Sequence, residues 1–359
     1  MKNTLNKDRL GRIISKMEAY GLDELFVTFN KSIYYLTGCY VSYPGERLIG
    51  LHITRQGEVS FLYNKVNGND VVDGCNMVRF SDTDDAVGIL ASLVKGKTLG
   101  VEKVWPSHFL LSLMGKLPDV KIVNGSPAID AVRAVKDEDE IKLLRQASKF
   151  NDAVFEAGFK QFSPDMTELD FAKLLKEISA KICKAQGGDM VCYGEGAADP
   201  HHSSSDVLVK PGDAILVDGG RSYNMYESDM TRTVFFGAPS KRDIEVYETV
   251  KAANLAAAAI IRPGVRCCDI DREGRKIIEA AGYGQYFTHR IGHNLGLEEH
   301  EPPDIGPLCE LEVVPGMCFS VEPGIYLPGE MGVRVEDLVI VTQDGCEILN
   351  FYTKELQIL

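Results

Sequence analysis

Hydrophobic residues recur at helical spacing in some parts of this chain and form short strand-like runs in others. The order of these predicted helices and strands differs between the two halves of the chain. In the first half, Leu10, Ile13, Ile14 and Met17 recur at helical spacing, and Gly21 ends that predicted helix. Short apolar runs follow it at 24–29, 32–38, 47–54 and 58–63. Alternating strands and helices are typical of an α/β layer. No glycine-rich phosphate loop accompanies these runs, so we expect a supporting domain rather than a nucleotide site.

The pattern changes near residues 124–137, where a cluster of turn residues leads into a charged helix start. Beyond it, four helices are predicted, at 138–162, 167–186, 241–261 and 268–281. Strand-like runs lie between and after them, at 189–194, 214–220, 231–237, 317–324 and 333–345. Helix pairs separated by a hairpin and followed by more strands indicate an α+β fold with a mostly antiparallel sheet. Because 359 residues are many for one core, we predict two domains, 1–125 and 126–359.

The composition of the chain argues against several classes of binding partner and of structural site. The formal net charge is −13 and no cluster of Lys and Arg stands out, which argues against nucleic acid or an anionic membrane. No apolar stretch is long enough to span a bilayer, and the richest, 252–261, indicates a buried helix. The nine cysteines are dispersed and form no C-x-x-C motif. A disulfide framework or thiolate zinc site is therefore not expected, and reduced thiols in a cytoplasmic protein fit better.

Five residues of the last third stand in contexts that are unusual for a structural role. Asp218 ends an apolar run, Asp229 precedes another, and His293 lies in a glycine-punctuated segment, while Glu322 and Glu336 lie beside or within predicted strands. Each of them alone has an ordinary structural explanation, such as a turn aspartate or a core histidine. Together, four carboxylates and one imidazole are costly to bury unpaired. They offer oxygen ligands and one nitrogen, enough for two divalent cations that share carboxylates.

Other polar residues near these five are candidates for contacting a substrate. His293 and His300 are seven residues apart in an irregular segment, unlike the helical H-E-x-x-H of zinc proteases. His201 and His202 would point to opposite faces of an extended segment, so at most one of them lines a site. The serines after them belong to no G-x-S-x-G elbow and are interpreted as turn residues. Arg334 would share a strand face with Glu336, where a guanidinium can hold a carboxylate.

Several of these motifs resemble the signature blocks of the pita-bread metallopeptidases, specifically the Xaa-Pro peptidases prolidase and aminopeptidase P. The blocks are VDGG, SDMTRT, GHNLGLEEHE, SVEPGIY and GVRVED, and GEGAADPHHSSSD is similar to the family's PH loop. In the first half, SIYYLTG and AVRAVKDEDEI resemble prolidase-like segments, so the resemblance covers nearly the whole chain. It implies a C-terminal pita-bread catalytic domain of the α+β class and a smaller, creatinase-like α/β domain before it.

The resemblance also implies a ligand set and a reaction. Asp229 and Glu336 would bridge two metal ions, Asp218 would bind one ion, and His293 and Glu322 would bind the other. Manganese or cobalt would be the expected ions, with zinc or iron as alternatives. A metal-bridging hydroxide would cleave the bond between an N-terminal residue and a following proline. Two cations fit this chemistry because they lower the pKa of water and stabilise the developing oxyanion.

Further roles follow from the same resemblance. Glu322 would also shuttle a proton, and His201 and His300 would contact the substrate carbonyl. Arg334 would orient Asp229 or touch the substrate. The first domain would limit access to short peptides with proline at the second position, as part of a homodimer.

Two positions depart from the family pattern. Asn294 stands where a glycine is frequent, and Asp304 stands where many prolidases have an arginine that binds the dipeptide's free carboxylate. A carboxylate there would repel that group and favour longer Xaa-Pro-Yaa peptides, unless another basic residue substitutes.

Three other functions remain open at this point. A metal-free amidinohydrolase resembling creatinase, or a non-catalytic binding module, would be expected to have lost ligands, and none is lost. A methionine aminopeptidase would usually lack the large first domain.

Overall fold

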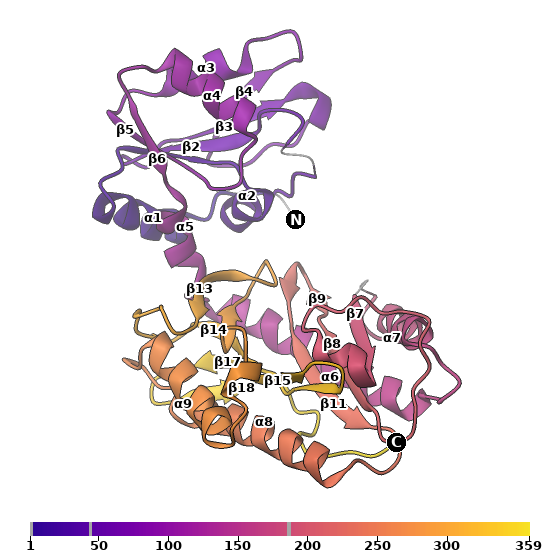
Figure 1. Ribbon diagram of the computed structural model, residues 1–359. Coiled ribbons are helices and arrows are strands. Elements are labelled where there is room, and N and C mark those ends of the chain that lie inside the picture. The colour runs from indigo at the N-terminus through magenta and orange to yellow at the C-terminus, as the bar shows by residue number, and fades with distance from the viewer. Residues whose placement is uncertain (1–2, 43–44, 185–187) are drawn as a thin grey trace. The chain divides into compact units, whose positions relative to one another are not determined.

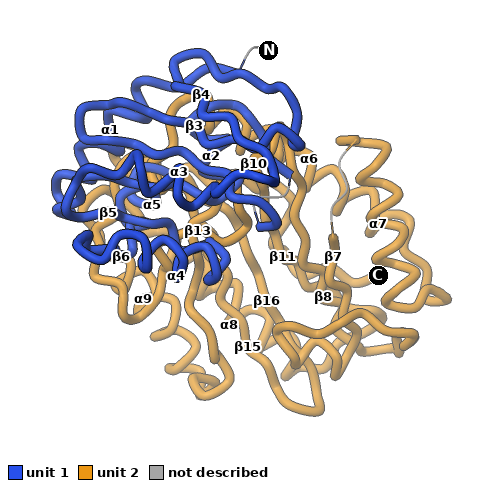
Figure 2. Tube along the Cα trace, turned by 90° about the horizontal axis from the view of Figure 1, so that it is seen from above, with its two compact units in different colours: residues 1–133 blue, residues 134–359 orange. Residues whose placement is uncertain are grey.

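The computed structural model describes residues 3–42, 45–184 and 188–359, which divide into two compact units. Unit 1 is residues 1–133 and unit 2 is residues 134–359 (Figure 2). The short helix α5 (Ser126–Arg133) lies with unit 1. The domain border that the sequence suggested after residue 125 stays a prediction.

Unit 1 is built on one mixed six-stranded sheet in the order β4-β3-β2-β1-β5-β6 (Figure 1). The strand β1 pairs antiparallel with β2 and parallel with β5, and β5 continues parallel to β6. The predicted α/β layer is therefore confirmed. The strands are β1 (Glu24–Val27), β2 (Gly50–Thr54), β3 (Val59–Asn64), β4 (Asn76–Phe80), β5 (Thr98–Val101) and β6 (Lys121–Asn124). The other helices are α1 (Lys7–Ala19), α2 (Asn30–Thr37), α3 (Ala86–Leu93), α4 (Ser107–Lys116) and the 3-10 turn η1 (Lys65–Asn67).

The apolar core on one side of this sheet includes an aromatic group. Trp105 meets Phe26 edge-on, with ring centroids 5.2 Å apart, and stacks on Phe109 at 5.9 Å. Offset and edge-on contacts of this kind add to the stabilisation that burial of the rings provides. They join β1 to the first turn of α4.

Unit 2 contains antiparallel sheets, as the sequence predicted (Figure 1). A three-stranded sheet has the order β11-β8-β7, and a five-stranded sheet has the order β13-β12-β14-β17-β18. Two hairpins, β9/β10 and β15/β16, accompany them. The first strands are β7 (Asp189–Tyr193), β8 (Ala214–Gly219), β9 (Ser222–Tyr223), β10 (Tyr226–Glu227) and β11 (Met230–Phe235). The later strands are β12 (Gly292–Asn294), β13 (Glu301–Ile305), β14 (Cys318–Val321), β15 (Gly324–Leu327), β16 (Met331–Arg334), β17 (Asp337–Val341) and β18 (Cys346–Ile348).

Four long helices cover these sheets, and α6 packs against α7 while α8 packs against α9. The first three begin with reciprocal capping boxes, at Asp137, Thr167 and Ser240, which satisfy backbone N–H groups that the helix leaves unpaired. The helices are α6 (Glu138–Gln161), α7 (Glu168–Ile182), α8 (Lys241–Ala259) and α9 (Cys267–Ala280), with 3-10 turns η2 (Gly194–Ala198) and η3 (Gly284–Tyr286). The predicted helix 167–186 is thus α7, and its last positions, 185–186, lie outside the described residues.

Two observations bear on the setting of the protein. Within the described residues, no helix combines the length and the apolar character that crossing a membrane requires. All nine cysteines of the sequence belong to the described residues, and each is a free thiol.

Candidate active site

The predicted hairpin places Asp218 and Asp229 at the same end of one strand pair. Strand β8 pairs antiparallel with β11, and Asp218 lies opposite Thr231. Asp229 immediately precedes β11, so both carboxylates lie where the hairpin arms open. The remaining predicted ligands come from the other sheet: His293 is in β12, Glu322 follows β14, and Glu336 precedes β17.

A cavity of about 280 Å³ in unit 2 collects these side chains. All eight candidate residues line it, namely His201, Asp218, Asp229, His293, His300, Glu322, Arg334 and Glu336. A larger cavity of about 800 Å³ in the same unit is lined by Asp152, Glu156, Lys160 and C-terminal residues. No histidine is found among the described residues that line this larger cavity, so the smaller cavity is the better candidate for chemistry.

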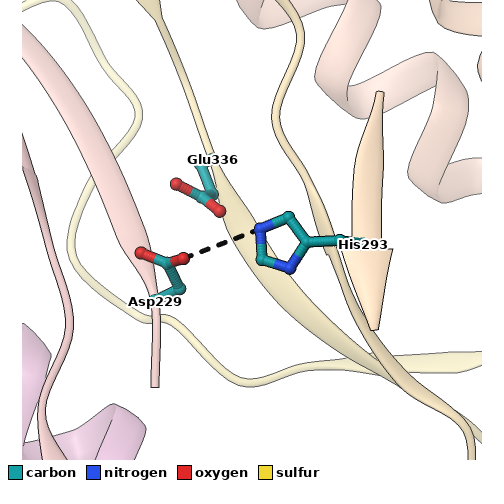
Figure 3. Close-up of side chains that lie close together, drawn as sticks. All are labelled: Asp229, His293 and Glu336. Carbon is teal, nitrogen blue, oxygen red and sulfur yellow. Dashed lines mark ion pairs between the residues drawn. The ribbon is translucent and has the colours of Figure 1, made fainter. Parts of the chain in front are cut away.

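Asp229, His293 and Glu336 point toward one another, and all three line the cavity (Figure 3). One ligating atom from each of the three lies within 4.8 Å of the others. His293 Nε2 is 3.8 Å from Asp229 Oδ2 and 3.3 Å from Glu322 Oε1. Oxygen and imidazole donors that converge at this spacing fit a divalent cation.

The imidazole of His293 is held in the form that a metal ligand requires. Its Nδ1 donates to the Asn294 carbonyl at 3.2 Å, which leaves the Nε2 lone pair free to face the carboxylates. Burial, followed by the neighbouring His300, lowers the pKa of His293 to about 3, so the ring is neutral. The Asn294 amide donates to the Pro303 carbonyl at 3.1 Å and ties β12 to β13.

The carboxylates of the cavity destabilise one another. Burial, and then the charges of neighbouring carboxylates, raise the pKa values of Asp229 and Glu336 well above their usual range. Burial also raises the pKa of Glu322 to about 7, although the Arg334 guanidinium opposes the shift. Glu336 Oε2 accepts a bond from Thr231 Oγ1 at 2.7 Å, but its buried Oε1 has no donor among the residues that the structure describes. Cations would relieve both the repulsion and this unpaired oxygen, so the residues fit a pair of metal ions.

Arg334 holds Asp218, whereas the resemblance implied that it would orient Asp229 or touch the substrate. Its Nη2 donates to Asp218 Oδ2 at 2.6 Å, Nη1 to the Tyr326 hydroxyl at 2.9 Å, and Nε to Thr231 Oγ1 at 3.0 Å. Because Thr231 and Asp218 are cross-strand partners, a guanidinium that reaches one also reaches the other. Asp229 lies before β11 and outside this pair.

His201 and His202 face different surroundings, although they lie at a turn, closed by the bond from the His202 N–H to the Asp199 carbonyl, and not in the extended segment that was expected. His201 lines the cavity, whereas His202 Nε2 lies 2.9 Å from the buried Glu168 carboxylate. His300 also lines the cavity, and its ring is 4.0 Å from that of His293. Burial, followed by the charge of Arg290, lowers the pKa of His300, so its ring is neutral near pH 7.

Sequence analysis did not single out several side chains of the cavity, among them Met190, His289, Arg290 and Glu299. His289 Nε2 lies 2.9 Å from the Tyr326 hydroxyl, which makes a chain from His289 through Tyr326 to Arg334. Burial, followed by the Arg334 charge, lowers the pKa of His289 to about 4. The only signal for His289, Arg290 and Glu299 in the sequence was their position beside His293 or His300.

Comparisons with known proteins agree with this geometry. The model of metallopeptidase family M24 matches residues 142–343, and that of the creatinase/prolidase N-terminal domain matches residues 9–135. An uncharacterized peptidase of Staphylococcus saprophyticus is 36% identical over 356 residues, covering 96% of this chain and 100% of the relative.

Two solved structures are similar over nearly the whole chain. A dipeptidase from Pyrococcus horikoshii OT3 is 33% identical with a TM-score of 0.91, over 98% of this chain and 100% of that one. A prolidase from Thermococcus sibiricus is 30% identical with a TM-score of 0.90, over 98% of this chain and 99% of that one. The fold and the site thus define a metal-dependent peptidase with a pita-bread catalytic domain. The chain belongs to metallopeptidase family M24, and its first unit is of the creatinase/prolidase N-terminal type.

Proposed function

We propose that this metallopeptidase cleaves the peptide bond between an N-terminal residue and a following proline in short peptides. The observation that carries the proposal is the convergence of Asp229, His293 and Glu336 within 4.8 Å, in a cavity that also contains His201 and His300. The dipeptidase and the prolidase that the chain resembles give the substrate class. A cavity of about 280 Å³ suits a short peptide rather than a folded protein.

Two divalent cations would be held by the five predicted ligands. Asp229 and Glu336 would be shared between the ions, Asp218 would complete one site, and His293 and Glu322 would complete the other. Mostly oxygen donors with one nitrogen suit manganese or cobalt. When bound, such cations supply a nucleophile from water at neutral pH and polarise a carbonyl group.

Proton transfer, hydrogen bonding to the substrate and orientation of the ligands would depend on Glu322 and on the side chains around the ligands. Glu322, whose Oε1 lies 3.3 Å from His293 Nε2, is placed to accept a proton and return it to the leaving amine. His300 and His201 would donate hydrogen bonds to the substrate carbonyl oxygen. These bonds strengthen as negative charge develops and so raise the rate more than the affinity. Arg334 would keep Asp218 in its ligating orientation.

The test uses the peptides Ala-Pro, Ala-Pro-Ala and Ala-Ala-Ala with protein reconstituted in manganese. Cleavage of at least one proline peptide, with slow cleavage of Ala-Ala-Ala, supports the proposal. Preferential removal of methionine from Met-Ala-Ser would identify a methionine aminopeptidase instead. A protein that binds two metal ions and cleaves none of these peptides would be a binding module.

Asp229→Ala provides the matched test of the metal set. Because a shared ligand serves both ions, the substitution should abolish activity and metal binding together. Two ions retained per chain, measured by elemental analysis, with full turnover would contradict the ligand assignment. Asp206→Ala, at an exposed position of the same unit, is the control and should retain both ions.

A homodimer and a cytoplasmic location remain predictions within the same proposal. The free thiols agree with a reducing compartment. Light scattering of the purified protein measures the oligomeric state directly.

A further inference from the structure

Two arginines line the cavity, and they differ in what their donors contact. Arg334 is 3% exposed, and its three kinds of nitrogen are bonded to Asp218, Tyr326 and Thr231. Its donors are therefore all used within the protein. Arg290 is the cavity arginine that is available for a contact with a substrate.

Arg290 presents donors to the cavity. Its side chain is 35% exposed, and its Nε lies 3.0 Å from Asp304 Oδ1 in an ion pair that lacks the alignment of a hydrogen bond. Within the described part of the chain, its Nη1 and Nη2 atoms donate no hydrogen bond to the protein. A planar guanidinium with these two atoms free can bind a carboxylate through parallel bonds.

The position of Asp304 differs from what the sequence suggested. A carboxylate at this position was expected to repel the free carboxylate of a dipeptide. In the structure, Asp304 is 65% exposed, is not among the residues that line the cavity, and faces Arg290. Its charge is thus offset by the guanidinium, and the expected repulsion does not follow. Asp304 instead holds Arg290 from the outer side.

The backbone explains why these two positions meet. Arg290 comes just before β12, and Asp304 lies in β13, opposite His293 in the antiparallel register. Gly306 leaves room for the arginine stem, because a Cβ at that position would lie 3.0 Å from Arg290 Cβ. The pair therefore stands at the edge of the ligand set.

The charges of the cavity show why such a residue is needed. Its lining contains five carboxylates, those of Asp218, Asp229, Glu299, Glu322 and Glu336. Two divalent cations and the Arg334 guanidinium would together offset these five charges. An incoming dipeptide adds a negative carboxylate of its own, and without Arg290 the wall would have no positive charge left to pair with it.

We propose that Arg290 binds the free carboxylate of the substrate's proline, with Asp304 orienting the guanidinium. This inference rests on the proposed Xaa-Pro peptidase function and deepens it. The preferred substrates are then Xaa-Pro dipeptides, which present that carboxylate one residue beyond the scissile bond.

The test compares Ala-Pro with Ala-Pro-amide, which has the same scissile bond and no terminal charge. Arg290→Gln should raise KM for Ala-Pro by about 10- to 100-fold, the effect of losing a charged hydrogen bond. KM for the amide should change less than about 3-fold on the same scale. Arg290→Lys keeps the charge and should recover part of the loss. Arg272→Gln, which removes an exposed arginine on α9, should behave as the wild type.

Two outcomes overturn the inference while the proposed function stands. One is an unchanged KM for Ala-Pro in both Arg290 variants, and the other is an equal rise for Ala-Pro and its amide. A wild-type protein that binds two metal ions and cleaves neither compound overturns the proposed function, and this inference with it. Metal content and thermal midpoint, measured for every variant, separate these outcomes from misfolding.

Discussion

His300 contributes its imidazole to the wall of the cavity while another histidine occupies the ligand position beside it. The His300 ring stands 4.0 Å from the His293 ring, and burial is the main cause that keeps its pKa below the usual value. A neutral imidazole at this place can donate a hydrogen bond to a substrate oxygen without repelling the metal ions.

His300→Ala should therefore leave folding and metal content intact and lower kcat by about 100-fold or more, as for other losses of a transition-state donor. KM should change much less, because the bond strengthens as charge develops. Steady-state kinetics with Ala-Pro measures both constants. His108→Ala, on the exposed side of α4 in unit 1, is the control. An unchanged kcat would remove His300 from the mechanism.

Some residues of the site could be predicted from the sequence by their chemistry, and others could not. The cavity positions of Asp218, Asp229 and His293 could be predicted, because these residues belong to short motifs whose apolar neighbours would not tolerate an unpaired charge. Arg290 could not, because its use depends on the direction of a side chain in irregular backbone. The contact of Arg334 was misjudged for a related reason, since it depends on how two separate hairpins meet.

At the scale of elements, the turn between β12 and β13 contains His300. A buried ion pair stabilises this turn. Lys136 Nζ lies 3.3 Å from Glu301 Oε2, and the two side chains are 1% and 3% exposed. Glu301 Oε1 accepts the backbone N–H groups of Leu297 at 2.9 Å and Glu298 at 3.2 Å. Gly296 packs between the pair, where a Cβ would come within 3.0 Å of both side chains. The lysine thus fixes the shape of the turn.

Lys136→Met should cost about 3–5 kcal/mol of unfolding free energy, because it breaks a buried ion pair. It should also lower kcat, since the turn that carries His300 loosens. Denaturant unfolding and peptide turnover measure the two effects. The double variant Lys136→Met/Glu301→Gln, in which the buried charge is removed, should regain much of the stability. Lys142→Met, at an exposed pair with Asp139, is the matched control. Unchanged stability in Lys136→Met would contradict the role of the pair.

Elements were predictable where local signals and tertiary packing agree. The long helices α6, α7 and α8 begin at capping boxes that are visible in the sequence. The run 32–38 shows the opposite case, since its aromatic and β-branched residues favour a strand by propensity. It forms the helix α2 instead, closed by Gly38 in the left-handed conformation at φ 69°.

For the whole molecule, the repulsion among the cavity carboxylates links stability to pH and to metal. The pKa values of Asp229, Glu322 and Glu336 are raised in the folded protein, so without metal their contribution to stability is present at low pH. That contribution is lost as the pH rises through the folded pKa, which is near 7 for Glu322. Bound cations remove the loss by neutralising the ionised groups.

The thermal midpoint of manganese-loaded protein should therefore exceed that of EDTA-treated protein by an amount that grows from about pH 5 to about pH 8. Scanning calorimetry at constant ionic strength measures this difference. Taking the difference between the two forms cancels every titrating group that the metal does not affect. A difference that stays constant or shrinks with rising pH would show that the carboxylates are not the cation site.

The aromatic contact between Trp105, Phe26 and Phe109 has a practical consequence. The sequence contains one tryptophan, and it lies in unit 1, whereas the candidate metal ligands all belong to unit 2. Indole fluorescence is therefore a built-in optical label for one half of the chain, and it reads the loosening of that aromatic packing alone. Recorded during the same heating scan as circular dichroism, it would show whether metal binding in unit 2 changes the temperature at which unit 1 unfolds.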